Sequence, residues 1–333
     1  MRRMAHKMTE PTFRIFTRSE LAGVELKPIE VIEAVRGGYL ALANGESRCP
    51  TKLMMPLPVA ERDAVSYSML GYDANSEHVG FKTSYRQGND HRGKYYTVLS
   101  LYDDTTGMPF ALLDCDRVGA SRTPATTALI AEACAKPDAR SALMIGTGVQ
   151  GHLTLPYLLT VLPNLDRLML FGTHPEGLKT TVEVLKQHFP DRDVELVDDV
   201  PSAVAESDIA VVASGRARHP KVQMAWMKPG GLMISVSSKG VADTALSEAD
   251  YALATSEGQL GVTGSRFAAA DGSATIDCEF PDIIAGRAPA RRSANDRVFA
   301  FSSGMVITDI PVGHLLVSRA IEQGRGTVVP LWS

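Results

Sequence analysis

Short apolar runs alternate with amphipathic segments through the second half of the chain. The runs cover residues 143–145, 167–171, 194–197, 209–213 and 232–236. After the first run, apolar residues from Leu153 to Leu159 follow a helical pattern, and residues 178–189 follow another. Buried strands that alternate with helices at this spacing predict an α/β fold with a doubly wound, parallel Rossmann sheet.

The first third of the chain has a different pattern. Residues 13–16 predict a strand and residues 29–45 a helix. Four more apolar or alternating runs follow at residues 65–70, 79–85, 95–102 and 110–113. Strands at such short spacing predict an antiparallel sheet that is separate from the α/β part. A boundary is expected near residues 117–123, with Pro124 in the first turn of a helix that runs through Cys134.

The last part of the chain returns to the pattern of the first. An apolar run at residues 298–301 opens this tail, and a helix through Leu315, Leu316 and Ala320 follows it. Residues 327–331 predict a final strand.

A glycine-rich turn links the first apolar run of the α/β part to the helix after it. The turn consists of Gly146, Thr147, Gly148, Val149, Gln150 and Gly151. In a dinucleotide site the first glycine makes a tight turn, the second lets backbone approach the pyrophosphate, and the third lets the helix pack closely on the strand. The helix N-terminus then offers N–H groups to the phosphates. Ordinary strand–helix turns can share this pattern, but the strands and helices around it favour dinucleotide binding.

Composition narrows the class of protein. A length of 333 residues is enough for two domains. The 34 Lys and Arg against 38 Asp and Glu give a net charge of −4, so neither nucleic acid nor an anionic membrane is expected as a partner. The four cysteines form no CxxC pair, which predicts reduced thiols and no metal site. Residues 1–7 lack the apolar core of a signal peptide, and no window is long enough to span a membrane. We expect a cytoplasmic protein.

Five stretches in register resemble the ornithine cyclodeaminase/μ-crystallin family. They are residues 80–82, 122–128, 145–151, 284–293 and 301–309. The resemblance extends over nearly the whole chain. It implies a Rossmann NAD(P)-binding domain at residues 123–300, inserted in an α+β substrate-binding domain of residues 1–122 and 301–333. It also implies a homodimer formed through the sheets of the substrate domains.

The chemistry of this family is hydride transfer between a nicotinamide and the α-carbon of an amino acid or its imine. The resemblance therefore implies an NAD(P)-dependent oxidoreductase, such as a ketimine or imino acid reductase, or an amino-acid or opine-type dehydrogenase. Two alternatives stay open. One is an ornithine cyclodeaminase-type lyase that uses bound NAD and releases ammonia, and the other is a non-catalytic NADP(H)-binding protein.

Lys82 and Arg122 are the candidate catalytic residues. A lysine inside an apolar strand is costly to bury unless it is paired, although the solvent face of a strand is its commoner place. The resemblance implies that Lys82 binds the substrate carboxylate and exchanges a proton at the imine. The planar fork of Arg122 suits a carboxylate, with a surface ion pair as the alternative. Thr123 and Thr126, near the predicted helix start, would contact phosphate or cap the helix.

Two further positions bear on the substrate. Asp309 matches a family aspartate, but it could also cap a helix in the tail. Lys239 stands where cyclodeaminases have an aspartate, which argues against plain cyclodeamination of ornithine. Lys239 would meet a second acidic group of the substrate or point to solvent.

The substrate-binding arginine of the family has no clear match in this chain. Tyr67 falls nearest to its position, and Arg48, Lys52 or Arg62 could supply the positive charge from another place. The amino-acid side of the site is therefore expected to differ from that of the common family members.

The choice of cofactor depends on the end of the second Rossmann strand. NAD enzymes usually carry an acidic residue at this point, and residues 170–174 contain none. Thr173 and His174 could accommodate a 2′-phosphate, so NADP(H) is favoured over NAD(H), although Glu176 keeps NAD(H) open. Ser214, after the apolar run at 209–213, completes the candidate cofactor contacts.

Overall fold

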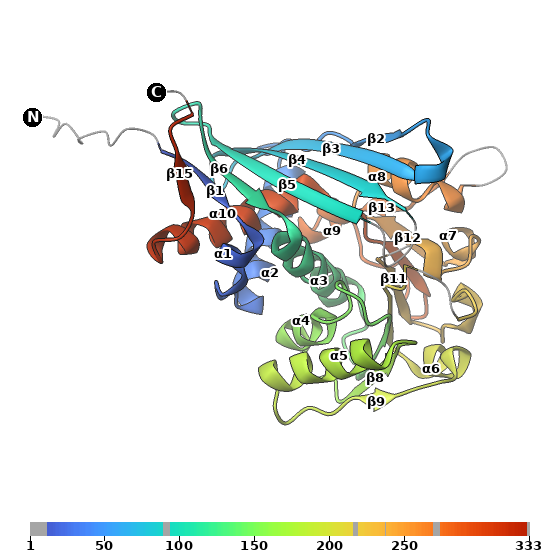
Figure 1. Cartoon of the computed structure of the whole chain (residues 1–333). Coiled ribbons are helices and arrows are strands. Elements are labelled where there is room, and N and C mark those ends of the chain that lie inside the picture. Colours follow the sequence, from blue (N-terminus) through green and yellow to red (C-terminus); the bar gives the residue numbers. More distant parts are fainter. Residues whose placement is uncertain (1–11, 89–93, 216–218, 237, 269–273, 332–333) are drawn as a thin grey trace, which may run out of the picture.

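The computed structural model describes residues 12–88, 94–215, 219–236, 238–268 and 274–331. They form two β-sheets covered by helices (Figure 1). In this part of the chain no helix is long and apolar enough to cross a bilayer. In the same residues no group of three or more His, Cys, Asp and Glu is placed to hold a metal ion.

The first sheet has seven strands. In spatial order they are β15 (Thr327–Val329), β1 (Phe13–Phe16), β6 (Met108–Asp114), β5 (Lys94–Asp103), β4 (His78–Gln87), β3 (Ala64–Asp73) and β2 (Leu53–Pro56). All neighbours are antiparallel except β1 and β6, which are parallel. The first and last strands described, β1 and β15, lie side by side at one end of the sheet (Figure 1).

Helices cover one face of this sheet, below it in Figure 1. They are α1 (Arg18–Ala22), α2 (Pro28–Ala43), α3 (Asp116–Cys134) and α10 (Val306–Glu322). Helix α10 packs on β3 and β4. Gly80 permits this approach, because a Cβ there would lie 2.4 Å from Cγ1 of Ile310. The contact places the first turn of α10, with Asp309, against the strand that carries Lys82.

The second sheet has eight strands and is the expected doubly wound Rossmann sheet. In spatial order they are β13 (Cys278–Glu279), β12 (Tyr251–Ala254), β14 (Val298–Phe301), β11 (Leu232–Ser235), β10 (Ile209–Val212), β7 (Ser141–Ile145), β8 (Arg167–Phe171) and β9 (Glu195–Leu196). Every neighbouring pair is parallel. Because the strand order reverses at β7, the crevice between β7 and β10 is the place where such sheets bind ligands.

Helices and short 3₁₀ turns surround the parallel sheet. The helices are α4 (Thr154–Val161), α5 (Pro175–His188), α6 (Val200–Glu206), α7 (Ala245–Glu248), α8 (Glu257–Thr263) and α9 (Phe280–Ile284), and the 3₁₀ turns here are η2 (Met224–Trp226), η3 (Ser238–Gly240) and η4 (Ser265–Phe267). In β7, Ala142 and Met144 belong to one hydrophobic core and Leu143 and Ile145 to the other. Both faces of the sheet are therefore buried, as continuous apolar runs predict.

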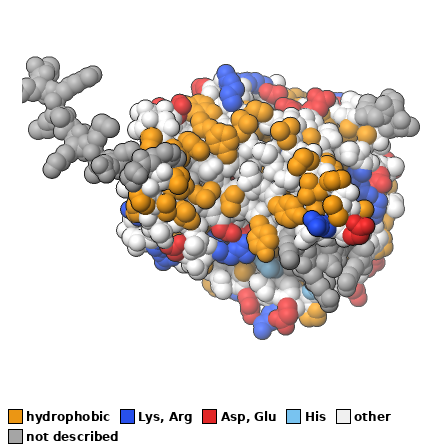
Figure 2. Space-filling view, turned by 45° about the horizontal axis from the view of Figure 1, so that its top comes forward, with side chains coloured by type: hydrophobic (Ala, Val, Ile, Leu, Met, Phe, Trp, Pro, Cys, Tyr) orange, Lys and Arg blue, Asp and Glu red, His pale blue; other side chains and the backbone are white. Residues whose placement is uncertain are grey.

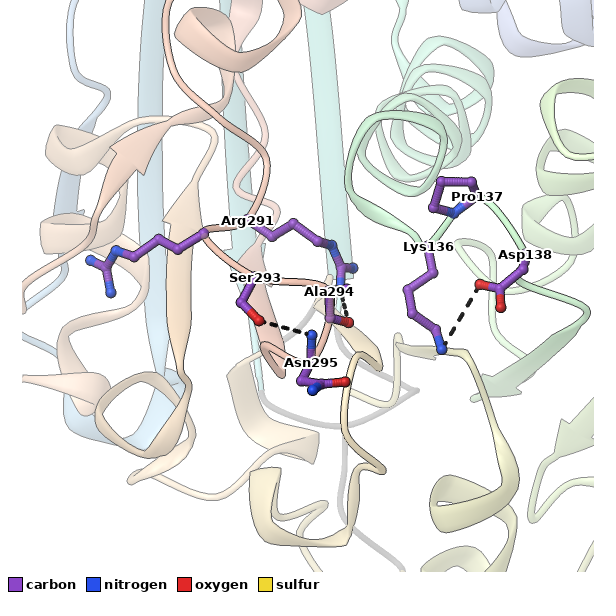
Figure 3. Close-up of a pocket in the computed structure, with 8 residues that line it drawn as sticks. Lys136, Pro137, Asp138, Arg291, Ser293, Ala294 and Asn295 are labelled. Carbon is purple, nitrogen blue, oxygen red and sulfur yellow. Dashed lines mark hydrogen bonds and ion pairs between the residues drawn. The ribbon is translucent and has the colours of Figure 1, made fainter.

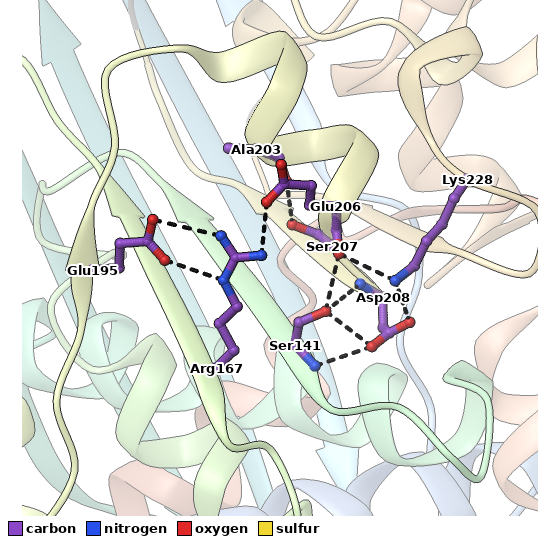
Figure 4. A network of polar contacts seen from close by, with 8 residues as sticks. All are labelled: Ser141, Arg167, Glu195, Ala203, Glu206, Ser207, Asp208 and Lys228. Carbon is purple, nitrogen blue, oxygen red and sulfur yellow. Dashed lines mark hydrogen bonds and ion pairs between the residues drawn. The ribbon is translucent and has the colours of Figure 1, made fainter.

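An ion network fixes the amino-terminal ends of the central strands (Figure 4). It consists of Ser141, Arg167, Glu195, Glu206, Asp208 and Lys228. Asp208 accepts hydrogen bonds from the backbone N–H and the hydroxyl of Ser141 and lies 2.7 Å from Nζ of Lys228. Burial raises the pKa of Asp208, but Lys228 and these hydrogen bonds outweigh it and hold the pKa at about 2. This network faces away from the ligand-binding edge and stabilises the sheet.

Two expectations from the sequence are wrong in detail. Helix α3 begins at Asp116, so Pro124 lies well inside it and the boundary expected at residues 117–123 falls within a continuous helix. Packing overrides the local preference of proline, because most residues of α3 from Val118 onward are buried. Strand β14 lies between β11 and β12, so residues 298–301 belong to the parallel sheet rather than opening the tail.

Candidate functional site

Two cations from distant parts of the chain share one buried carboxylate. Nζ of Lys82, in β4, lies 2.7 Å from Oδ1 of Asp309, and Nε of Arg122, in α3, lies 3.0 Å from the same oxygen. Asp309 is fully buried in the first turn of α10. Its other carboxylate oxygen, Oδ2, is buried and has no hydrogen-bond partner among the described residues.

Burial and charge act in opposite directions on these three groups. Burial is the largest single effect and lowers the pKa of Lys82 and of Arg122, but the charge and hydrogen bond of Asp309, with smaller contributions from neighbouring groups, together outweigh it, so both pKa values are raised. Burial raises the pKa of Asp309, but the two cations outweigh it and hold that pKa below its usual value. All three groups are therefore ionised at neutral pH.

Lys82 and Arg122 face a cavity of about 340 Å³, a size that suits a small ligand. Its lining consists of Lys52, Tyr67, Met69, Lys82, Ser84, Arg86, Tyr95, Arg122, Thr263 and Gly304. Nζ of Lys52 donates a hydrogen bond to Oγ of Ser303 at 3.1 Å. Burial, together with the charges of Arg122 and Lys82, lowers the pKa of Lys52 to about 8.

The structure corrects two of the expected substrate contacts. Asp309 does not line the cavity, because it lies behind Lys82 and Arg122 and has no exposed surface. It positions those two side chains instead. Arg48 also lies elsewhere, because its exposed guanidinium donates to the backbone oxygen of Ser47 at 2.9 Å, next to the end of α2.

The other substrate candidates are divided between the cavity and the surface. Lys52 and Tyr67 line the cavity. Arg62 is exposed in the 3₁₀ turn η1 (Ala60–Arg62). Lys239 is exposed in η3, just after the carboxyl end of β11, and is not part of the cavity lining.

Sequence reasoning missed six of the lining residues, namely Met69, Ser84, Arg86, Tyr95, Thr263 and Gly304. A signal for two of them was available. Ser84 and Arg86 follow Lys82 in β4 at intervals of two residues, so all three side chains lie on one face of the strand. Thr263 and Gly304 reach the cavity from the ends of α8 and β14, and no local pattern marks them.

The glycine turn has the geometry that a dinucleotide requires. Gly146 has a φ of 112°, and a Cβ on Gly151 would lie 2.0 Å from the carbonyl oxygen of Gly146. A Cβ on Gly148 would meet nothing within 4 Å. The turn is thus closed on the protein side and open at Gly148, where a pyrophosphate would approach. These residues fit a dinucleotide, although α4 begins only at Thr154 rather than directly after Gly151.

The other residues of the turn differ in exposure. Thr147 packs against the start of α5, since a Cβ on Gly177 would lie 2.5 Å from its Oγ1. Val149 is exposed, whereas Oε1 of Gln150 is buried without a hydrogen-bond partner among the described residues.

The remaining cofactor candidates fall into two groups. Thr173 and His174 are exposed between β8 and α5, and Ser214 follows β10 with its Oγ 2.8 Å from Nε2 of His219. These three lie near the carboxyl ends of strands next to the glycine turn. Thr123 and Thr126 do not lie at a helix N-terminus.

Thr123 and Thr126 lie inside a helix rather than at its start, because α3 begins at Asp116. The hydroxyl of Thr123 donates to the carbonyl oxygen of Gly119 at 2.9 Å, and that of Thr126 lies 3.4 Å from the hydroxyl of Tyr39. Both side chains are buried inside the helix, so the argument that placed them on phosphate no longer holds.

The cavity and the glycine turn lie on the same edge of the parallel sheet. Gly304 and Arg122 meet just after β14, because a Cβ on Gly304 would lie 2.5 Å from Nη2 of Arg122. Gly146 follows β7, and the strands between them, β11 and β10, run in the same direction. A dinucleotide on the turn and a small molecule in the cavity would therefore occupy one continuous edge.

A second cavity, of about 360 Å³, lies at the opposite edge of the sheet (Figure 3). It is lined by Lys136, Pro137, Asp138, Arg291, Arg292, Ser293, Ala294 and Asn295. The guanidinium of Arg291 already donates to the carbonyl oxygens of Gly230 and Asp296, at 3.1 and 3.3 Å. Its polar groups are therefore engaged in holding loops together, and we assign it no ligand.

Comparison with known proteins identifies relatives over nearly the whole chain. The model of the ornithine cyclodeaminase/mu-crystallin family matches residues 15–324. The nodulation efficiency protein NfeD of Rhizobium meliloti is 22% identical, over 95% of this chain and 98% of its own length. A Delta(1)-pyrroline-2-carboxylate reductase of Paracoccus denitrificans is 28% identical, over 90% of this chain and 94% of its own. The structure of Thermococcus litoralis Delta(1)-pyrroline-2-carboxylate reductase, with NADH and L-proline, superimposes with a TM-score of 0.80 at 24% identity, over 95% of this chain and 100% of that one.

Proposed function

Because the chain belongs to the ornithine cyclodeaminase/mu-crystallin family, we propose that it is an NAD(P)-dependent oxidoreductase acting on the α-carbon of an imino or amino acid. The relative from Paracoccus denitrificans is a reductase of this kind by its name. One structural observation carries the proposal for this chain. A cavity lined by cations shares an edge of the sheet with a glycine turn that fits a dinucleotide.

The residues of the cavity suit a carboxylate next to a reacting carbon. Asp309 occupies Nε of Arg122 and one donor of Lys82. Among the described residues the Nη groups and the remaining ammonium donors have no other partner, so they could bind the α-carboxylate. Binding there would fix the imine carbon toward the nicotinamide, which supplies a hydride when it is bound. Orientation of this kind accounts for much of the rate in such reactions.

Lys52 is the proposed proton donor. Reduction of a C=N bond would leave its electron pair on nitrogen, which would then need a proton from a side chain. Lys52 lines the cavity, and its pKa of about 8 lies near working pH, as efficient acid–base catalysis requires. The Lys82 ammonium, held by Asp309, has a raised pKa and suits anion binding better.

NADP(H) is the proposed cofactor in preference to NAD(H). Thr173 and His174 are exposed where the adenosine ribose would lie, and residues 170–174 offer no carboxylate to hold its hydroxyls. Without that acidic residue, a 2′-phosphate meets no repulsion at this point.

We further propose that two copies associate through the outer face of the seven-stranded sheet. Large apolar side chains are exposed there, and Figure 2, in which the top of Figure 1 is turned forward, shows hydrophobic side chains gathered on this side. They include Leu53, Met55, Leu70, Phe81, Tyr96 and Val98. A contiguous exposed patch of this kind is typical of an interface.

All four cysteines are free thiols, which suits a cytoplasmic location.

The first experiment is a fluorescence titration with NADPH and NADH, followed by a panel of 2-keto acids with amines and of preformed cyclic imines. Binding with oxidation of the reduced cofactor would support the reductase, and Lys82→Ala should then lose turnover while nucleotide binding stays nearly intact. Tight binding without oxidation, with ammonia released from ornithine, would favour the lyase. Tight binding without any turnover would favour a binding protein.

A further inference from the structure

The cavity holds more positive charge than the described residues neutralise. Four cations line it: Lys52, Lys82, Arg86 and Arg122. Among the described residues, Asp309 is the carboxylate in contact with two of them, and no carboxylate lines the cavity. One α-carboxylate from a substrate would therefore leave part of the charge unmatched. Partly buried cations require anionic partners.

Arg86 marks the end of the cavity away from Asp309. It lies on the same face of β4 as Lys82 and Ser84, opposite Tyr95 of β5. At about 3.3 Å per residue along a strand, its Cα is about 13 Å from that of Lys82. Its Nε is buried and has no hydrogen-bond partner among the described residues. A buried donor in this state is costly, and an anion in the cavity would satisfy it.

The surroundings of Arg86 also suit an anion. Tyr67 lines the cavity from β3. It is paired with Ser84 of β4, which lies between Lys82 and Arg86 along that strand. The charge of Arg86 acts on the phenol of Tyr67, lowering its pKa against the larger effect of burial, which raises it. The two side chains are therefore close enough to act on one group, the guanidinium by charge and the phenol by its O–H.

We propose that the substrate carries a second anionic group and that Arg86 binds it, while Lys82 and Arg122 hold the α-carboxylate. This inference rests on the proposed function and names its substrate class. The distance along β4 places the second group several bonds from the reacting carbon. An imine formed from a dicarboxylic 2-keto acid has this chemistry.

The test compares two keto acids of equal chain length, 2-oxoglutarate and 2-oxopentanoate, each with ammonia and NADPH. A charge-assisted hydrogen bond predicts a kcat/KM about tenfold or more in favour of 2-oxoglutarate. Arg86→Gln should remove this preference by lowering kcat/KM for 2-oxoglutarate about tenfold to a hundredfold, with 2-oxopentanoate changed less than about twofold. Arg86→Lys keeps the charge and should retain part of the preference. Arg62→Gln, outside the cavity, is the matched control and should change neither value.

A binding measurement separates recognition from turnover. Thermal unfolding with NADP⁺ present should show a larger rise in Tm with glutarate than with pentanoate, and Arg86→Gln should abolish the difference. Equal turnover of both keto acids, with Arg86→Gln lowering both alike, overturns the inference and leaves the reductase function standing. A protein that oxidises neither NADPH nor NADH with either keto acid, or with a preformed cyclic imine, overturns the proposed function and the inference together.

Discussion

One carboxylate oxygen sets the direction of both candidate catalytic cations. Oδ1 of Asp309 accepts from Lys82 and from Nε of Arg122, and the Nη end of the guanidinium has no hydrogen bond to the described residues. Gly304 makes room for this end, because a Cβ there would lie 2.5 Å from Nη2 of Arg122. The buried aspartate thus positions the two side chains that we propose to bind substrate, and it does not line the cavity itself.

Replacing Asp309 by Asn would leave two buried cations without their counter-charge. Removing one partner of a buried ion pair typically costs about 3–5 kcal/mol, so Asp309→Asn should lower the free energy of unfolding by an amount of this order. Urea unfolding measures it. Asp250→Asn, which breaks the more exposed pair with Arg297, is the control and should cost no more than about 1 kcal/mol. An unchanged midpoint for Asp309→Asn would contradict the buried triad.

The pKa of Lys52 predicts a pH dependence of substrate binding. In the free enzyme the ammonium loses its proton above about pH 8, and the neutral amine no longer attracts a carboxylate. The KM for the imino acid should therefore rise as pH increases through this range. Arginine stays charged, so Lys52→Arg should abolish the rise and also lower kcat, because it cannot donate the proton. The measurement is a pH profile of KM and kcat between about pH 6 and 10.

At the scale of single residues, the sequence indicates which side chains are candidates for the chemistry but not which residues they contact. Lys82 could be singled out because a lysine in an apolar strand needs compensation, and Arg122 because the resemblance places it there. Both side chains pair with Asp309 because α10 packs on β4. No local sequence pattern predicts that contact. Arg48 is an example of a charged residue whose contact the sequence does not predict. The loop after α2 determines that its guanidinium donates to the carbonyl oxygen of Ser47 and not to a ligand in the cavity.

The turn after β7 is the element on which the proposed cofactor binding depends. Its first and third glycines are required by the fold, and the second faces open space. The two roles can be separated by experiment because alanine adds one methyl group at each position.

Gly148→Ala should therefore fold normally but bind nucleotide poorly. The new methyl meets no protein atom, so the free energy of unfolding should change by less than about 0.5 kcal/mol. It would stand where the pyrophosphate approaches, so the Kd for NADPH should rise tenfold or more, on the order of 1.4 kcal/mol. Gly151→Ala is the counterpart, with a methyl 2.0 Å from the Gly146 oxygen, and overpacking should cost about 1–3 kcal/mol of stability. Equal loss of stability in both variants would show that the second glycine is structural.

Elements with a strong period were predictable and those set by packing were not. The runs around β7, β8, β10 and β11 gave the parallel sheet, because buried strands read as continuous apolar segments. The start of α3 was misjudged because Pro124 favours a first turn locally, whereas the buried helix extends through it. The place of β14 follows from strand order, which a single strand's sequence does not carry.

At the scale of the whole molecule, the outer face of the seven-stranded sheet exposes apolar side chains, and its proposed use is dimerisation. Phe81→Lys should convert a dimer into a monomer, because a charge would have to be buried in the interface. Size-exclusion chromatography with light scattering measures the mass in solution. Leu196→Lys, on the exposed strand β9, replaces a similarly exposed apolar residue on the other sheet and should leave the mass unchanged. A wild-type chain that is monomeric at micromolar concentration would rule out this interface.

The distance in sequence between Arg122 and Asp309, 187 residues, has a consequence for synthesis of the chain. At about 5–20 residues per second, a ribosome needs roughly 10–40 s to cover that interval. During this interval Lys82 and Arg122 have been synthesised but Asp309 has not. The strand β15, which is the antiparallel neighbour of β1, is made later still. All eight strands of the parallel sheet, β7 to β14, are synthesised within this interval. The seven-stranded sheet is therefore the first to begin synthesis and the last to be completed. A nascent chain that stops before α10 would contain the whole parallel sheet but would lack Asp309 and so the complete candidate site.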